Sequence, residues 1–198
     1  MLRCAVVSLG FFVLARPVLA DSWAPAKLMA RMSEDGAYVV RVVPGKSMGD
    51  VFGYAGRPQG PYATAEWYHF KRGSYMKVAT ATLLNPIAPI DIEVSSLGFL
   101  VAIDNWHNLG IRDVVSIYSP DGKLVRALKL TDLYSPADLS RIESSTSSIH
   151  WRCESKRSAW IERNERELWI IDSFGGQFVF QLKSGSFEYK SEFGACKR

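Results

Sequence analysis

The sequence lacks the motifs that would assign an activity directly. It contains no Gly-x-Ser-x-Gly elbow and no glycine-rich loop followed by Lys-Ser or Lys-Thr, and its three histidines are too far apart for metal-ligand spacing. These absences give no support to a serine hydrolase, a phosphate-loop enzyme or a zinc site. We therefore expect no cofactor and no bound metal.

A strong excess of one charge is also missing. The chain has 24 Lys and Arg residues against 20 Asp and Glu residues, a formal net charge of +4. Residues 1–20 contribute Arg3 and Arg16 and no acidic residue, so the remainder carries only +2. Such an even balance gives no support to a nucleic-acid or anionic-membrane partner. We expect an unknown protein or small ligand instead.

Only one long apolar run is present, at residues 4–15. Its 12 residues are too few to span a bilayer as a helix. A basic start precedes it, and small residues ending at Ala20 follow it. This pattern predicts that residues 1–20 are a secretory signal peptide, with an uncleaved anchor as the alternative. Residues 21–198 would then form one exported domain, periplasmic or secreted, without a transmembrane segment.

Cysteine is scarce as well, because only Cys153 and Cys196 lie outside the predicted signal peptide. In an oxidising compartment such a pair favours a disulfide. Closing a loop of this length stabilises the fold by about 4 kcal/mol in the chain-entropy account. The alternative is a reactive Cys153 near His150, but on a strand these two residues would face opposite sides.

What the sequence does contain is a series of short apolar runs separated by turn signals. Four runs in residues 89–130 predict a four-stranded antiparallel meander around which the rest is organised. Further runs come before and after it, including 149–153 as a predicted strand. The predicted fold class is all-β: an antiparallel meander of hairpins in propeller-like stacked sheets, or alternatively a β-sandwich, with about a dozen short strands.

One short helix is predicted near residues 136–143. Ser135 is a good N-cap, Pro136 suits the first helical position, and Asp138 occupies the position of a capping-box acid. This helix is the one segment whose local signals favour α-structure over a strand.

Residues 44–63 form the main shift in composition, a loop rich in glycine and proline. The aromatic residues Phe52, Tyr54 and Tyr62 are interleaved in it. A loop of this length inside a compact domain is usually functional or disordered, and the aromatic residues argue against plain disorder. It would contribute to a binding surface or, alternatively, cover an open sheet edge.

An internal repeat accompanies the predicted strands. Residues Ser33–Arg41 (SEDGAYVVR) recur as Ser119–Arg126 (SPDGKLVR), a third version spans Ile92–Asp104, and residues 178–187 echo the unit. The unit resembles the blades of NHL-type and related six-bladed β-propellers, in which a strand ends in a Ser-x-Asp-Gly-like turn before an apolar strand. The chain is also similar in general character to exported bacterial proteins of unassigned activity. At roughly 40 residues a blade, three or four such units fit, and the resemblance implies no activity.

The most polar strand end is Asp104-Asn105-Trp106-His107-Asn108. Asp104 and His107 are candidates for an acid–base pair, and Asp104 with Asn105 for a hard-cation site. The structural interpretation, which we favour, is a connection capped by Asp and Asn with Trp106 packed beneath it.

Trp151, Trp160 and Trp169 recur every nine residues across predicted strands. They would form an aromatic platform for a sugar or peptide, or alternatively stack in the core, which we favour.

Three functions follow from these observations. We favour a non-enzymatic exported binding or protein-interaction module, with binding residues Phe52, Tyr54, Tyr62, Asn105, Trp106 and Asn108. The alternatives are a periplasmic hydrolase or metal-dependent enzyme using Asp104 and His107, and an envelope scaffold subunit.

Overall fold

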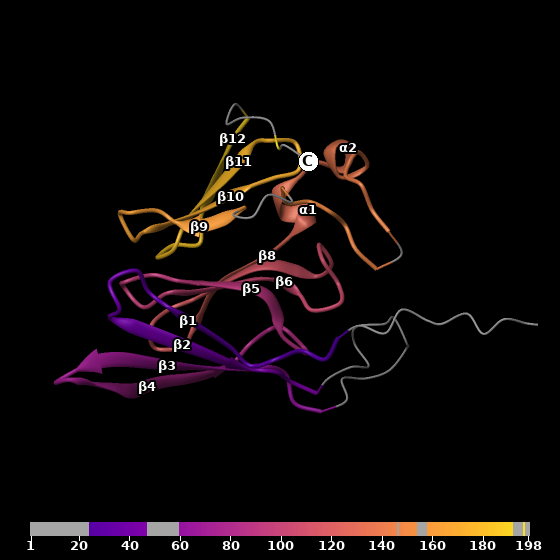
Figure 1. Cartoon of the computed structure of the whole chain (residues 1–198). Helices are drawn as coiled ribbons and strands as arrows, with labels where there is room; N and C mark the ends of the chain where they lie inside the picture. The colour runs from indigo at the N-terminus through magenta and orange to yellow at the C-terminus, as the bar shows by residue number, and fades with distance from the viewer. Residues whose placement is uncertain (1–23, 47–59, 146, 154–157, 192–195, 197–198) are drawn as a thin grey trace, which may run out of the picture.

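The computed structural model describes residues 24–46, 60–145, 147–153, 158–191 and 196. In these ranges the chain forms 12 β-strands and two short α-helices (Figure 1). The strands form three four-stranded antiparallel sheets, each built from strands that follow one another in the sequence. The predicted all-β class of stacked antiparallel sheets is therefore confirmed.

Sheet 1 precedes the central meander. It consists of β1 (Met29–Met32), β2 (Tyr38–Val43), β3 (Thr64–Lys71) and β4 (Ser74–Thr82) in that order. Side chains alternate along β3: Trp67 is fully buried, whereas Phe70, on the opposite face, is exposed. The fourth strand, β4, lies at the edge of the sheet and is exposed along most of its length.

Sheet 2 is the meander predicted over residues 89–130. It consists of β5 (Pro89–Val94), β6 (Leu100–Asn105), β7 (Asp113–Tyr118) and β8 (Leu124–Lys129). Every residue of β6 is buried, which means that both faces of this strand are covered. Sheet 2 is therefore the middle layer of the molecule, and its near-continuous apolar runs reflect burial on two sides.

Sheet 3 follows the helices. It consists of β9 (Ala159–Ile161), β10 (Glu167–Ile171), β11 (Gln177–Gln181) and β12 (Phe187–Lys190). The prediction of a strand over 149–153 is wrong. The chain bends there, with the Trp151 N–H bonded to the Ile149 carbonyl at 2.9 Å, and makes only isolated bridges.

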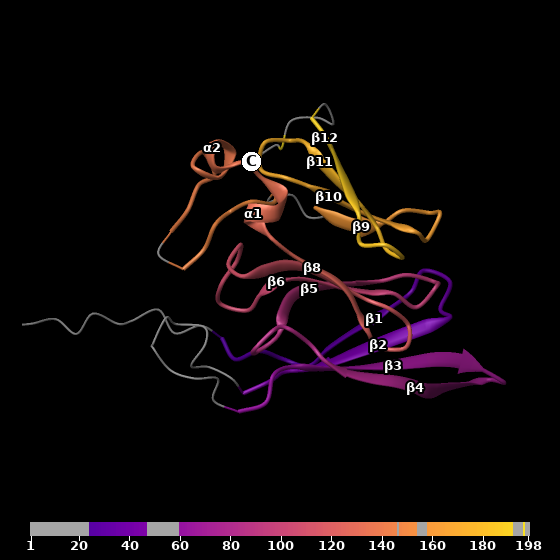
Figure 2. The same cartoon turned by 180° about the vertical axis from the view of Figure 1, so that it is seen from behind.

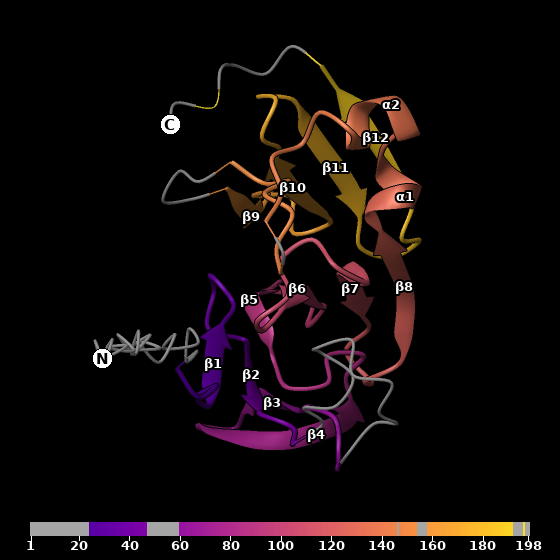
Figure 3. The same cartoon turned by 90° about the vertical axis from the view of Figure 1, so that its right-hand side faces the viewer.

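Two apolar cores hold the three sheets together. The first lies between sheets 1 and 2 and includes Val40, Trp67 and Tyr118. The second lies between sheets 2 and 3 and includes Ile117 and Phe178. The first strands of the sheets, β1, β5 and β9, contact one another in succession, and Figure 3 shows them along one side of the stack. The three sheets therefore stack with their first strands in contact.

The two helices link sheets 2 and 3. They are α1 (Leu130–Leu133) and α2 (Pro136–Leu139). The predicted N-cap is confirmed, because the Ser135 hydroxyl accepts a hydrogen bond from the Asp138 N–H at 3.2 Å. The helix ends at Leu139 rather than 143, since the Arg141 and Ile142 amides bond three residues back instead of four. Helix α1 was not predicted, because a single helical turn carries no periodicity.

The repeated Ser-x-x-Gly turns have one conformation. In the turns that begin at Ser33, Ser95 and Ser119, the glycine N–H bonds to the serine carbonyl at 2.9–3.0 Å. Each of these glycines has a positive φ of 73–83°, which favours glycine. At Gly98 a side chain is also excluded sterically, because a Cβ would lie 2.8 Å from the Tyr38 ring. The repeat therefore marks equivalent hairpins in sheets 1 and 2.

A disulfide joins Cys153 to Cys196, as predicted. The two Cα atoms are 5.6 Å apart and the residues are 43 positions apart in the sequence. The bond ties the end of the chain to the segment that precedes sheet 3. The reactive-cysteine alternative does not apply to Cys153 in this bonded state.

Candidate functional site

The described connections that carry α1, α2 and the β6–β7 turn lie at one end of the stack, which we call the loop end (Figures 1 and 2). The described roots of the 44–63 loop are held here by hydrogen bonds from Gly45 N–H to the Ile87 carbonyl (2.7 Å) and from Lys46 N–H to the Pro61 carbonyl (2.7 Å). The Trp106 N–H bonds to the Ala88 carbonyl at 2.9 Å. The 44–63 loop and the Asp104–Asn108 rim thus share one hydrogen-bonded region.

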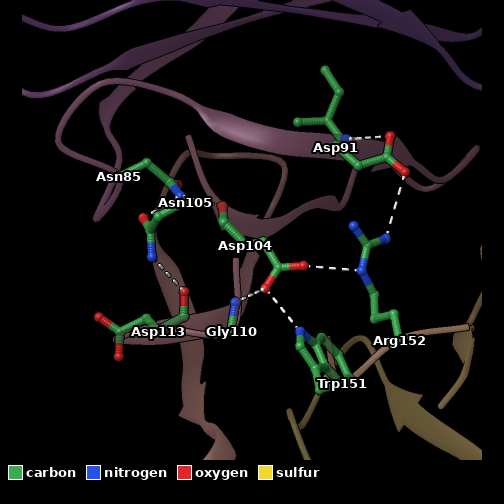
Figure 4. A network of polar contacts seen from close by, with 9 residues as sticks. Asn85, Asp91, Asp104, Asn105, Gly110, Asp113, Trp151 and Arg152 are labelled. Atoms are coloured by element: carbon green, nitrogen blue, oxygen red, sulfur yellow. Dashed lines mark hydrogen bonds and ion pairs between the residues drawn. The ribbon is translucent and has the colours of Figure 1, made fainter. Parts of the chain in front are cut away.

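Asp104 lies at the centre of this end (Figure 4). Its side chain is fully buried. Oδ1 accepts hydrogen bonds from the Gly110 N–H at 2.9 Å and the Trp151 indole N–H at 2.8 Å. Oδ2 lies 2.9 Å from Arg152 Nε in an ion pair. Asp104 therefore joins sheet 2 to the segment that leads into sheet 3.

Burial raises the pKa of Asp104, while the Arg152 guanidinium and the two N–H donors oppose that rise. Arg152 also lies 3.8 Å from the Asp91 carboxylate on β5. Gly110 is required at this position, because a Cβ would lie 2.5 Å from the Ile149 carbonyl oxygen. The cluster therefore packs tightly enough to exclude a bound substrate from the carboxylate.

Asn105 also has a structural role, because its side chain holds the β6–β7 connection in place. Its amide nitrogen donates to the carbonyls of Ile111 (2.9 Å) and Asp113 (3.1 Å), and its Oδ1 accepts from Asn85 at 2.9 Å. Asn108 is also buried. Both side chains shape the β6–β7 connection from within, so neither offers its amide to a partner.

His107 is buried, with 6% of its surface exposed and a φ of 71°. Burial lowers its pKa below the ordinary value for histidine. Its ring packs edge-on against Trp106, with centroids 5.9 Å apart. A catalytic acid–base pair must reach substrate, and the burial of both Asp104 and His107 argues against that role.

Two of the predicted binding residues at the loop end are half-buried and accessible, Tyr62 and Trp106. The Trp106 indole N–H donates to the Ala24 carbonyl at 3.2 Å. Phe52 and Tyr54 lie outside the described residues. The structure thus brings Trp106 and the root of the aromatic loop to one end, while Asn105 and Asn108 are interior.

The three tryptophans separate into two groups. Trp151 is fully buried in the core between sheets 2 and 3. Trp160 and Trp169 pair across β9 and β10, with ring centroids 5.9 Å apart, and both are half-buried. The Lys190 ammonium covers the Trp169 ring at 5.6 Å. The core interpretation is correct for Trp151 only.

Exposed apolar side chains are concentrated on sheet 1, which the sequence reasoning did not identify as a site. Of the 11 large hydrophobic side chains that are exposed among the described residues, five lie on its strands. We call these five the sheet 1 patch: Met32 (57% exposed), Phe70 (49%), Tyr75 (43%), Met76 (54%) and Val78 (46%). Three of them are on β4.

Within the sheet 1 patch, Tyr75 contacts both Phe70 and Met32, whereas Met76 lies on the opposite face of the sheet. The Phe70 and Tyr75 rings pack with centroids 5.1 Å apart. The Tyr75 hydroxyl donates to the Gly36 carbonyl at 2.8 Å and lies 3.5 Å from Met32 Sδ. Its aromatic members are therefore held in place rather than free to rotate. The sequence pattern that could have revealed the patch is that of β3, where Trp67 and Phe70 place large aromatic side chains on opposite faces of the sheet.

Positive charge surrounds the patch. Along β3 and β4 the cations are Lys71, Arg72 and Lys77, and the acid is Glu66. Glu66 already accepts a hydrogen bond from Tyr68 (2.9 Å) and pairs with Arg41 and Lys77, and these contacts lower its pKa. The surface is thus apolar with a basic border.

No protein-family model matches the chain, and no curated protein matches it. In the described ranges, no three His, Cys, Asp or Glu side chains come together as a metal would require. No helix among the described residues has the length and hydrophobicity needed to cross a bilayer. The loop end and the sheet 1 patch therefore remain as the two candidate binding surfaces.

Proposed function

We propose that this protein is a non-enzymatic binding module that captures an extended segment of a partner protein by adding it as a strand beside β4. The observation that carries the proposal is the nine-residue β4, an exposed edge strand with apolar side chains on both faces. Its outer N–H and C=O groups pair with no other strand of the described chain. Such an edge is a template for strand addition.

The side chains of β4 suit an alternating partner. Tyr75 is paired with Phe70, and Met76 with His69, so Tyr75 and Met76 face opposite sides of the sheet. An added strand would therefore meet an apolar contact on each face. Burying the exposed half of one such side chain contributes about 1 kcal/mol.

The partner segment should carry acidic residues. Lys71, the last residue of β3, and Arg72, in the turn that leads into β4, make no ion pair within the described residues. Acidic side chains on the incoming strand would lie near them and near Lys77. Lys77 and the bulge beside it also discourage two β4 edges from pairing with each other. We therefore favour a different protein over a second copy.

We also propose that the protein acts after export. The Cys153–Cys196 disulfide supports this, because such bonds persist in oxidising compartments. The predicted signal peptide at residues 1–20 lies outside the described residues. The enzyme alternative loses support from the burial of Asp104 and His107, and the scaffold alternative predicts no strand capture.

The test uses a synthetic peptide of alternating valine and glutamate, four of each, and the mature chain. We expect binding, with slowed hydrogen exchange of β4 amides. A peptide with lysine in place of glutamate should bind more weakly. N-methylation of alternate peptide amides should abolish binding, because it removes the backbone donors.

Variants locate the contact. Met76→Ser should lower the affinity for the peptide by about fivefold, because less apolar surface is buried on binding. Leu124→Ser, at a side chain 46% exposed on sheet 2, is the matched control and should leave affinity unchanged. Equal binding of the N-methylated peptide, no protection at β4, or a dimer that occupies β4 would each refute the proposal.

A further inference from the structure

A cleft opens between sheets 2 and 3, at the opposite end of the stack from the loop end. Its volume is about 480 Å³, within the roughly 300–1,000 Å³ of small-molecule sites. The residues that line it are Leu97, Phe99, Arg166, Gln181, Leu182 and Lys183. We call it the sheet 2–3 cleft. It shares no residue with the sheet 1 patch.

The wall of this cleft is apolar. Leu182 is fully buried, and Phe99 is a half-buried neighbour of the core between sheets 2 and 3. Leu97 is 48% exposed although it is one of the lining residues. It precedes Gly98, whose φ of 83° sets the turn. An exposed leucine held in a cleft leaves apolar surface for a ligand to cover.

Two cations stand beside this apolar wall. The Leu182 N–H bonds to the Arg166 carbonyl at 2.8 Å, which places Arg166 next to the strand end that carries Lys183. Both side chains are exposed, and neither forms an ion pair within the described part of the chain. The cleft thus combines an apolar surface with two available positive charges.

The carboxylates near these cations have other partners. Glu165 accepts a hydrogen bond from the Ser96 N–H at 2.6 Å. Glu167 accepts from the Gln181 amide at 2.9 Å and from the Trp169 indole N–H at 3.0 Å. These hydrogen bonds direct both carboxylates to the neighbouring backbone and side chains, so Arg166 and Lys183 remain available to an external anion.

We infer that the sheet 2–3 cleft binds a small amphiphile with one aliphatic chain and one anionic headgroup. The chain would lie against Leu97 and Phe99, and the headgroup would lie between Arg166 and Lys183. Charge complementarity selects an anion over an uncharged or cationic amphiphile. A free carboxylate and a phosphate ester share this chemistry.

The test is titration calorimetry of the mature, disulfide-bonded chain with laurate, dodecyl phosphate and dodecanol below their micelle concentrations. We expect at least one anionic probe to bind, and to bind more tightly than dodecanol. The tighter anion identifies the carboxylate or the phosphate source. If neither anion binds, or if dodecanol binds equally well, the inference is wrong.

Point variants distinguish binding in the sheet 2–3 cleft from binding elsewhere on the protein. Arg166→Ala with Lys183→Ala should weaken the anionic probe about five- to tenfold, the effect of two exposed charge contacts. Lys27→Ala with Lys129→Ala removes equal charge elsewhere, at two exposed positions, and should have no effect. Leu97→Glu should abolish binding while the exposed position preserves the fold. Binding that survives Leu97→Glu, or that Met76→Ser removes, would overturn the assignment.

Discussion

Replacement of Asp104 by alanine tests whether its carboxylate joins sheet 2 to the segment that leads into sheet 3. The change removes an ion pair with Arg152 at 2.9 Å and leaves that cation, 12% exposed, without its buried partner. It also removes the acceptor for Gly110 and Trp151. Breaking a buried pair costs about 3–5 kcal/mol. Alanine at a φ of 56° adds about 1–2 kcal/mol.

The expected loss is therefore about 4–7 kcal/mol, a large share of the roughly 5–15 kcal/mol that stabilises a typical domain. Asp104→Asn keeps the side-chain size, one oxygen acceptor and tolerance of positive φ. It should cost less, about 1.5–3 kcal/mol, because it mainly weakens charge-assisted hydrogen bonds. Asp104→Gly should lose about 1 kcal/mol less stability than Asp104→Ala, because glycine adopts a positive φ without steric cost.

The assay is urea unfolding of the disulfide-bonded chain, followed by tryptophan fluorescence and circular dichroism. Unchanged m-values would show that the variants unfold from equally compact native states. Arg152→Met, combined with Asp104→Asn, should recover part of the loss because no unpaired cation remains. A cost below about 1 kcal/mol for Asp104→Ala would refute the idea that this carboxylate holds the sheets together.

Two further predictions concern the termini of the fold and its response to pH. Reducing the disulfide, or replacing Cys153 and Cys196 by serine, should lower the free energy of unfolding by about 4 kcal/mol in urea titrations; no change would show that the 43-residue loop is already constrained in the unfolded state. Because burial lowers the pKa of His107 below 6.5, the unfolded chain binds that proton more tightly. Stability from this group should be full above pH 6.5 and should fall as pH drops below it toward the folded-state pKa. His107→Asn, which tolerates a φ of 71°, should flatten the melting temperature over that interval, and an unchanged profile would contradict the assignment.

Local sequence determined the strands and turns of this protein. Short apolar runs between turn signals placed the four strands of residues 89–130, and the Ser-x-x-Gly repeat placed the turns at Ser33, Ser95 and Ser119. The N-cap at Ser135 was also readable. These features depend on backbone conformation and hydrogen bonds within a few residues, which neighbouring side chains encode directly. The cysteine pair was predictable for another reason, because only two candidates remained outside the predicted signal peptide.

Tertiary structure alone decided which side chains are free to act. Asp104 looked like a polar strand end, but Trp151, 47 residues away, and Arg152 close over its carboxylate. Met76 looked like an ordinary strand residue, but β4 is the edge strand of sheet 1, and Met76 remains 54% exposed. The physical reason is the same in both cases. Burial depends on which sheet stacks on which face, and that depends on contacts between segments far apart in the chain.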